Sequence, residues 1–361
     1  MSEKMKEWKK TGKTITGLIL FGAVLVAVVV FLSYLYRPVT NSRENICGFY
    51  AETKDSLDMV YIGGSACYVY WEPLAAWKDY GFTSYNFATD AIPPQVIPYI
   101  MEEIRKTQSP EVFLVDLRPY QYGELVDSES GLLNYQREAP LRNVIDNMKY
   151  SGNRAAMIQA CVPENQDRMA YHFDLAKYHS LLISLLEPEN WKYSTNEYSM
   201  PDKGFHPCEE KEALPIVDVS GIREKAALEP HMDELLTELL EYCRKEELQV
   251  LFLVHTYEIS EEDQKLYNTM EEKILSYGFD YLNTNDVYAE IGLDAEQDFY
   301  NRNHVNLLGA DKYTSFLADY LKEHYELPDK RQDPAYQKWT EAYQDWQKRM
   351  EPIRSRLKGE S

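Results

Sequence analysis

The stretch LDMVYIGGSACYVYWEPLAAWKDYGFTSYNFATDAIPPQVIPYIMEEIRKTQSPEVFLVDL, residues 57–117, decides the fold class. It alternates short apolar runs with segments whose apolar residues recur at helical spacing. The predicted strands are 57–62, 82–87 and 111–117, and the predicted helices are 73–81 and 94–106. Strands that alternate with helices predict a mostly parallel sheet with helices on both faces, which is an α/β fold.

The same alternation returns later in the chain. It predicts helices at 232–244, 261–277 and 307–324, with strands at 249–254 and 279–282. Between the two parts, about 118–230, the sequence is rich in Tyr, Asn and Pro, with helical stretches around 142–150 and 173–186. We interpret 45–325 as one α/β domain and 118–230 as a helical insertion that caps its sheet.

The last segment, 332–361, predicts an amphipathic helix. Asp333 and Pro334 suit the N-cap and the first helical position. Aromatic and apolar residues then recur every three or four positions, at Tyr336, Trp339, Tyr343, Trp346 and Met350. Two heptads are too few for a coiled coil, so we expect this helix to dock on the domain, with self-association as the alternative.

The N-terminus predicts a membrane anchor. Residues 14–36, TITGLILFGAVLVAVVVFLSYLY, carry no charge, and a helix of that length spans roughly 34 Å, enough to cross a bilayer. A cleaved signal peptide has a shorter apolar core of about 7 to 15 residues that ends at small residues. This run instead ends in Tyr34, Leu35 and Tyr36, where interfacial aromatic residues are expected.

Charge beside this run predicts its orientation. Residues 1–13 carry the basic excess, whereas Arg37 and Arg43 are the basic residues just after the run; the lysines are Lys4, Lys6, Lys9, Lys10 and Lys13. Positive flanks stay in the cytoplasm. We therefore expect a single-pass protein of the cell membrane, with residues 1–13 cytoplasmic and the main domain extracytoplasmic.

Composition narrows the functional classes. The formal charge of −21, from 59 acidic and 38 basic residues, would repel nucleic acid. The five cysteines form no CxxC pair, and His172 and His179 stand two helical turns apart, about 10.5 Å, too far for one metal ion. No phosphate loop or dinucleotide fingerprint occurs, so we expect no metal and no cofactor.

Two residues could carry chemistry at one edge of the sheet. Ser65 follows Gly63 and Gly64 at the end of the first predicted strand, and His304 stands between the last strand and the last helix. Ligands of open α/β sheets bind at that edge, and a serine hydroxyl needs a general base such as imidazole. A Gly-Gly-Ser turn by itself is also what any strand-to-helix connection favours.

The chain resembles a known family at these two positions. YIGGSACYVYWEPLAAWKDYGFTSYNFATDA with EVFLVDL resembles the opening of bacterial SGNH (GDSL-like) hydrolases, and DFYNRNHVNLLGADKYTSFLADYL resembles their closing block. YHFDLAKYHSLL and VLFLVHTYEISEEDQKLYN are similar to a membrane-anchored Gram-positive branch, which includes the D-alanyl transfer protein of teichoic acid modification. The resemblance covers about 45–325 and implies a three-layer, flavodoxin-like fold.

The resemblance also implies roles for individual residues. Ser65 would be the nucleophile and His304 the base, with the Gly64–Ser65 turn forming part of an oxyanion hole. The second oxyanion donor would come after the second strand, where Ala88 replaces the usual glycine. The third family block, Gly-x-Asn-Asp, is replaced by Asp-Leu-Arg-Pro at 116–119, where Arg118 could contribute a charge.

The residue that orients the histidine is left open. The position three before His304 is Asn301 rather than the usual aspartate, and Asp298 stands six before it. An amide cannot stabilise imidazolium as a carboxylate does; in serine proteases, replacing the triad aspartate by asparagine lowers turnover by about 10⁴. His255 ends a core strand at the same edge and could line the pocket or serve packing.

Two functions follow from this sequence. The first is an extracytoplasmic serine esterase or acyltransferase of SGNH type acting on acyl groups of an envelope glycan or polymer, in partnership with the membrane and with a membrane O-acyltransferase. The second is a catalytically weak SGNH-like binding or scaffold component of an envelope assembly. Asn301 and the missing third block favour the second.

Overall fold

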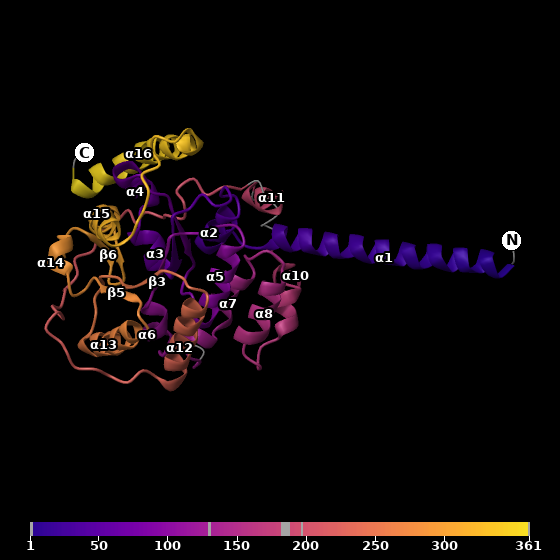
Figure 1. Cartoon of the computed structure of the whole chain (residues 1–361), viewed down its shortest axis with the longest axis horizontal. Helices are drawn as coiled ribbons and strands as arrows, with labels where there is room; N and C mark the ends of the chain where they lie inside the picture. Colours follow the sequence, from indigo (N-terminus) through magenta and orange to yellow (C-terminus); the bar gives the residue numbers. More distant parts are fainter. Residues whose placement is uncertain (1–2, 129–130, 182–187, 196–197, 360–361) are drawn as a thin grey trace. The chain divides into compact units, whose positions relative to one another are not determined.

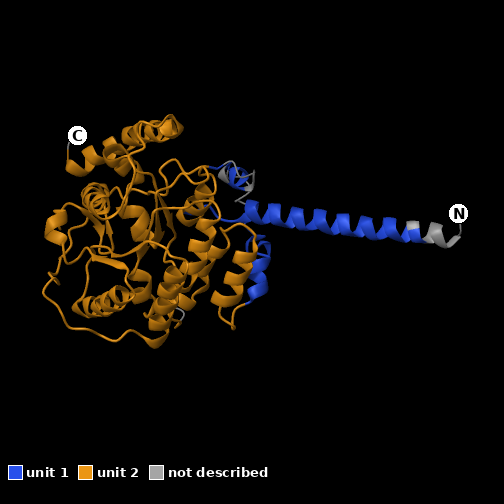
Figure 2. Ribbon diagram, viewed as in Figure 1, with its two compact units in different colours: residues 1–40, 167–198 blue, residues 41–166, 199–361 orange. Residues whose placement is uncertain are grey.

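The chain falls into two compact units. The computed structural model describes residues 3–128, 131–181, 188–195 and 198–359. The first unit consists of residues 1–40 and 167–198, and the second of residues 41–166 and 199–361 (Figure 2). The sheet and the predicted site residues all belong to the second unit.

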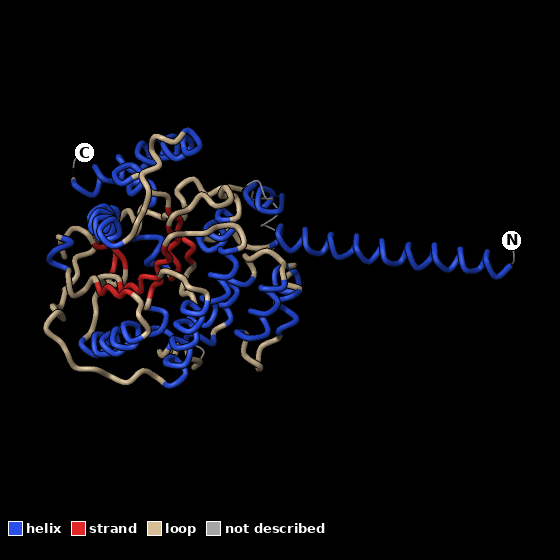
Figure 3. Tube along the Cα trace, in the orientation of Figure 1, coloured by secondary structure: helices blue, strands red, loops and turns tan. Residues whose placement is uncertain are grey.

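The second unit is built on a five-stranded sheet with the strand order β2-β1-β3-β4-β5. All four strand pairs are parallel, which confirms the predicted α/β class (Figure 3). The strands are β1 (Met59–Gly63), β2 (Ser84–Ala88), β3 (Val112–Asp116), β4 (Val250–Val254) and β5 (Asp280–Asn283). Chain order reverses at β1, which pairs with β2 on one side and β3 on the other, and ligands bind in the crevice at such a point.

Helices flank the sheet (Figure 1). Every residue of β1 to β4 is buried. The predicted helices are found as α4 (Pro73–Tyr80), α5 (Ile97–Arg105), α12 (Pro230–Lys245), α13 (Glu261–Ser276) and α15 (Leu307–His324). The predicted start of α5 at Pro94 is a separate 3-10 turn, η1 (Pro94–Val96).

Several short elements were not predicted, and most of them carry the site. They are α2 (Asn41–Phe49), α3 (Ser65–Tyr70), α6 (Arg118–Gly123), α14 (Tyr288–Ile291), β6 (Phe299–Asn301) and β7 (His304–Val305). Strands β6 and β7 form an antiparallel hairpin of their own, in which Asn301 pairs with His304. The sequence predicted only a turn between β1 and the helix at 73–81. The structure has the additional helix α3 there, directly after β1.

The middle region differs from the expected single insertion. In the second unit it holds α6, η2 (Asn134–Gln136), α7 (Glu138–Ile145) and α8 (Gly152–Cys161). Residues 167–198 belong to the first unit, with α9 (Arg168–His172), α10 (Leu175–Tyr178) and α11 (Pro188–Thr195). The helix predicted at 173–186 is only the four-residue α10 in its described part, and 182–186 lie outside the described residues.

The first unit contains one long helix, α1 (Glu3–Tyr36). Among the described residues, α1 is the one helix whose length and composition suffice to cross a membrane, with a mean hydropathy of 2.9 over its apolar window. The side chains of that window are not covered by the rest of the chain. This agrees with the predicted apolar segment.

The C-terminal segment docks on the second unit, as predicted. Asp333 caps the 3-10 turn η4 (Pro334–Tyr336), which leads into α16 (Gln337–Lys358). The stripe residues Trp339, Trp346 and Met350 are buried, and α16 packs on α4 and α15. Arg354 of α16 also donates two hydrogen bonds from Nε and Nη2 to the Asp311 carboxylate of α15, at 2.8 and 2.6 Å.

Candidate active site

Ser65 is the first residue of α3, at the carboxyl end of β1. Gly63 is the residue that permits this turn, because a Cβ there would lie 2.2 Å from Cys67 Sγ and 2.5 Å from Asp116 Cβ. Gly64 is less constrained, since the nearest atom to its added Cβ would be Asp116 Oδ2 at 3.8 Å. Because Gly63 has no side chain, β1, α3 and β3 can approach one another closely there, and this approach positions Ser65.

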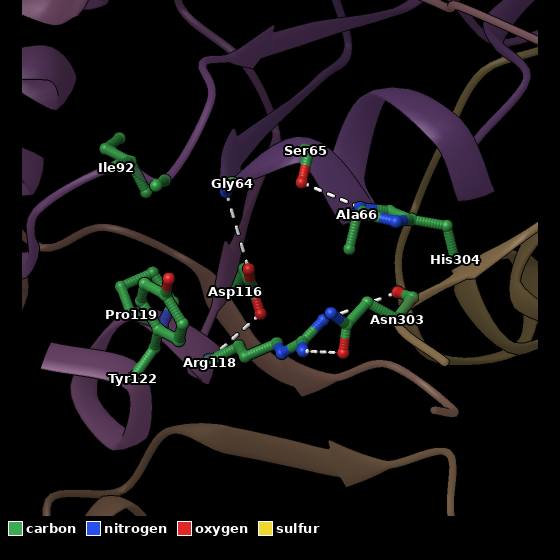
Figure 4. Close-up of a pocket in the computed structure, with 11 residues that line it drawn as sticks. Gly64, Ser65, Ala66, Ile92, Asp116, Arg118, Pro119, Tyr122, Asn303 and His304 are labelled. Atoms are coloured by element: carbon green, nitrogen blue, oxygen red, sulfur yellow. Dashed lines mark hydrogen bonds between the residues drawn. The ribbon is translucent and has the colours of Figure 1, made fainter. Parts of the chain in front are cut away.

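The hairpin β6–β7 brings His304 to Ser65. The two residues are 239 positions apart in the chain, and Ser65 Oγ lies 2.8 Å from His304 Nε2 (Figure 4). Both side chains are only partly exposed. The distance fits a hydrogen bond between a nucleophile and its general base.

Asn301 sets the tautomer of His304. Its Oδ1 accepts a hydrogen bond of 2.9 Å from the Asn303 backbone N–H and lies 3.0 Å from His304 Nδ1. A backbone N–H can only donate, so the amide atom facing it is the oxygen, and the His304 Nδ1 beside that oxygen must carry the proton. The lone pair of Nε2 is then directed at the Ser65 hydroxyl.

His304 is held in its neutral form. Burial, followed by the electrostatic effects of Arg118 and His255, lowers the pKa of His304 from its ordinary 6.5 to about 4. The imidazole is therefore unprotonated at neutral pH and can accept a proton. A histidine that was already protonated at neutral pH could not accept the serine proton.

Asp298 has a different role from the one that the sequence left open for it. Its buried carboxylate lies 2.5 Å from Lys312 Nζ of α15 and accepts a hydrogen bond of 2.7 Å from the Asp294 backbone N–H. Of the two candidates, the structure brings Asn301, not Asp298, to His304. Asp298 thus links the loop before β6 to helix α15.

A buried carboxylate supports the nucleophile turn. Asp116, at the end of β3, accepts hydrogen bonds from the backbone N–H groups of Gly64, at 3.4 Å, and Arg118, at 3.0 Å (Figure 4). His255 Nδ1 lies 3.2 Å from the Asp116 carboxylate, and His255 Nε2 lies 2.6 Å from the Tyr61 hydroxyl. His255 is thus fully buried behind Asp116 and does not line the pocket.

Arg118 connects two sides of the site. Its Nη2 donates to Asn303 Oδ1 at 2.5 Å and its Nη1 donates to the Asn303 carbonyl at 3.3 Å (Figure 4). The guanidinium carbon lies 4.2 Å from the centre of the Tyr257 ring. Arg118 thereby joins the start of α6 to the turn between Asn301 and His304, and it adds positive charge to the pocket.

A cavity of about 140 Å³ opens beside these side chains. Its lining residues are Gly64, Ser65, Ala66, Ala91, Ile92, Asp116, Arg118, Pro119, Tyr122, Asn303 and His304. Ala88 is not among them: it is fully buried, and its carbonyl accepts a hydrogen bond from Asn45 Nδ2 at 3.0 Å. The residues after β2 that do reach the cavity are Ala91, with a positive φ of 50°, and Ile92.

Sequence reasoning missed several residues of this site. Asp116 could have been recognised, because a carboxylate that ends a buried strand at the ligand edge needs partners there. Asn303 and Tyr122 carry no such signal, since one lies in a hairpin turn and the other in a short helix that no periodicity indicated. Among the described residues, no group of three or more His, Cys, Asp or Glu side chains is arranged around a possible metal position.

No family model matches the chain, and no curated protein matches it. The fold and the site therefore define this protein as an α/β protein with a serine–histidine–asparagine arrangement at the carboxyl edge of a parallel sheet.

Proposed function

We propose that this chain is a membrane-anchored serine esterase or acyltransferase of SGNH type. The observation that supports the proposal most strongly is the chain of contacts from Ser65 Oγ through the His304 ring to Asn301 Oδ1. The strand order β2-β1-β3-β4-β5 suits the three-layer, flavodoxin-like fold of that family, and Ser65 and Asp116 lie at its β1/β3 switch point. The sequence blocks that resemble the family hold the same two residues, Ser65 and His304.

In the proposed reaction, Ser65 Oγ attacks the carbonyl carbon of an ester while His304 Nε2 takes the hydroxyl proton. His304 then gives that proton to the oxygen of the departing alcohol, and an acyl-serine remains. Water or a sugar hydroxyl next attacks the acyl-serine, with His304 again accepting a proton and returning it to Ser65. Hydrolysis and transfer differ only in that acceptor.

The first turn of α3 would stabilise the oxyanion. The backbone N–H groups of Ser65 and Ala66 have no acceptor within the helix, because the first amides of any helix lack one. Gly64 is a poorer candidate than expected, since its N–H already donates to Asp116. Arg118 adds a positive charge at the same cavity.

The cavity suits a small acyl group. Its volume of about 140 Å³ is modest, and Ile92, Pro119 and Tyr122 provide apolar surface beside the polar residues. We infer that the acyl group belongs to a glycan or polymer of the cell envelope. The orientation expected from the N-terminal lysines, with the second unit outside the cell, would place the site there, where a membrane O-acyltransferase is the proposed partner.

The alternative is a binding or scaffold component with little catalysis. One observation favours it: an amide rather than a carboxylate faces His304 Nδ1. An amide orients the ring but does not neutralise an imidazolium. The scaffold alternative requires that ligand binding survive Ser65→Ala.

An ester panel separates the two functions. The detergent-solubilised full chain would be tested with p-nitrophenyl acetate, butyrate and octanoate, beside Ser65→Ala and the matched control Ser276→Ala, whose hydroxyl is exposed. The enzyme proposal expects turnover that prefers acetate or butyrate and is lost only in Ser65→Ala. Equal rates for all three chains would contradict it.

A further inference from the structure

The first unit joins the apolar helix to a segment far away in the sequence. Helices α10 and α11, from residues 167–198, contact α1, and Figure 2 shows these parts together near the C-terminal end of α1. The side chains of α1 are exposed through most of its apolar run, whereas Ser33 and Leu35 near its end are buried. The segment therefore packs against α1 near the C-terminal end of that helix.

An ion pair fixes this segment at the end of the apolar run. Arg37 Nε donates to Asp174 Oδ2 at 2.6 Å, and both side chains are buried. The Arg37 guanidinium also lies 4.4 Å from the centre of the Tyr34 ring. Buried charges need such pairing, and Asp174 directly precedes α10, so the pair sets the start of α10 at the level of Arg37.

An aromatic contact places α11 deeper along α1. The rings of Phe31 and Trp191 meet edge to face with centroids 6.1 Å apart. Phe31 stands five residues before Tyr36, which is about 7.5 Å along the helix axis from the end of the apolar run. Tryptophan favours that depth below a membrane surface, and interfacial segments insert by about 5 to 10 Å.

Large apolar side chains of the same segment are exposed. The exposed fractions are 58% for Met169, 52% for Phe173, 36% for Leu181 and 49% for Trp191. We call these four residues the apolar collar. Single exposed apolar residues are ordinary, but these four belong to one segment that is attached to the apolar helix itself.

We propose that the apolar collar lies in the lipid bilayer, in the headgroup and upper acyl region of the leaflet at the C-terminal end of α1. The chain would thus hold the membrane with a transmembrane helix and an interfacial segment together. The exposed Lys177, between Phe173 and Leu181 in sequence, and the exposed Lys192, directly after Trp191, suit phosphate headgroups at that level. This inference rests on the membrane anchor of the proposed function and not on its chemistry.

Depth-dependent quenching tests the collar. Single cysteines would be introduced in the full chain as Met169→Cys and Phe173→Cys, labelled with NBD and reconstituted in phosphatidylcholine and phosphatidylglycerol vesicles. Lipids with a spin label at acyl position 5 or 12 serve as quenchers. Labelling of the chain without an added cysteine gives the background from its native thiols.

Two control positions make the result decisive. Val24→Cys reports the middle of the apolar run, and Leu275→Cys reports a side chain of the second unit with a matched exposed fraction of 53%. We expect both collar labels to be quenched at least threefold more than the Leu275→Cys label, and most by the position-5 lipid. The Val24→Cys label should be quenched most by the position-12 lipid.

The label at position 24 tests the membrane anchor, and the labels at positions 169 and 173 test the collar. Quenching at Val24→Cys without quenching at either collar position would overturn the collar proposal and leave the anchor intact. Such a result would mean that the collar faces water or a protein partner. Absence of quenching at Val24→Cys would overturn the anchor, and the collar proposal with it.

Discussion

His304 Nδ1 and Asn301 Oδ1 lie 3.0 Å apart, at opposite positions of the β6–β7 hairpin. The Asn303 N–H on the same oxygen fixes the amide, so Asn301 gives His304 the tautomer that a general base needs. What Asn301 lacks is the negative charge of a carboxylate. Orientation and charge stabilisation, which an aspartate supplies together, are therefore separated in this site.

Asn301→Asp should increase activity. In serine proteases the aspartate-to-asparagine change costs about 10⁴ partly through the wrong tautomer, but here the tautomer is already correct, so we expect a gain of roughly 10- to 100-fold in kcat/KM. Asn301→Ala, which removes the acceptor, should lower it. The measurement is steady-state hydrolysis of p-nitrophenyl acetate, and an unchanged rate in both variants would contradict the role of Asn301 in orienting His304.

The reactivity of Ser65 should depend on pH through His304. Because the pKa of His304 is lowered to about 4, the rate of fluorophosphonate labelling should stay level from about pH 8 to 5 and fall by half near pH 4. Arg118→Gln removes a positive charge that lowers this pKa, so its acid limb should move to higher pH. Circular dichroism at each pH controls for unfolding, and a midpoint near 6.5 in the native chain would contradict the burial argument.

The two buried aspartates should behave differently. Asp116→Asn weakens the acceptor of the Gly64 and Arg118 amides, and hydrogen bonds to a charged group contribute about 1.5 to 3 kcal/mol, so both the free energy of unfolding and the labelling rate should fall. Asp298→Asn loses the Lys312 contact and should lower stability alone. Chemical denaturation and labelling rates measure the two effects. A shift of the acid limb in Asp298→Asn would restore Asp298 as the partner of His304.

The two glycines of the turn form a matched pair. Gly63→Ala would force a Cβ to 2.2 Å from Cys67 Sγ, so we expect loss of labelling together with a stability loss of at least ~2 kcal/mol. Gly64→Ala meets its nearest neighbour at 3.8 Å and should retain most of both. Equal effects of the two substitutions on thermal unfolding would show that the turn is not set by the space at Gly63.

The sequence predicted the core of the fold because that core consists of long, regular signals. Strands β1, β3 and β4 are mostly apolar runs, and the longer helices of the second unit have helical periodicity and turn residues at their ends. Helix α3 was missed because SACYVY has poor helix propensity. Burial of Cys67 and Tyr70 stabilises it, and that is a tertiary effect.

The site was predictable only where it depends on strand ends. Ser65 and His304 follow from their places along the chain, but the choice between Asn301 and Asp298 does not. That choice is decided by Lys312, which pairs with Asp298 from α15, and by the hairpin register that sets Asn301 opposite His304. Strands of two and three residues are too short to leave a pattern in the sequence.

Fluorophosphonate labelling of the full chain, with intact mass to count adducts, tests the central claim most directly. Ser65→Ala and His304→Ala would be compared with the native chain, with His324→Ala as a matched control at an exposed histidine. The account predicts one adduct on the native chain and on His324→Ala, and none on Ser65→Ala or His304→Ala. No adduct on the folded native chain, or one that persists in Ser65→Ala, would contradict it.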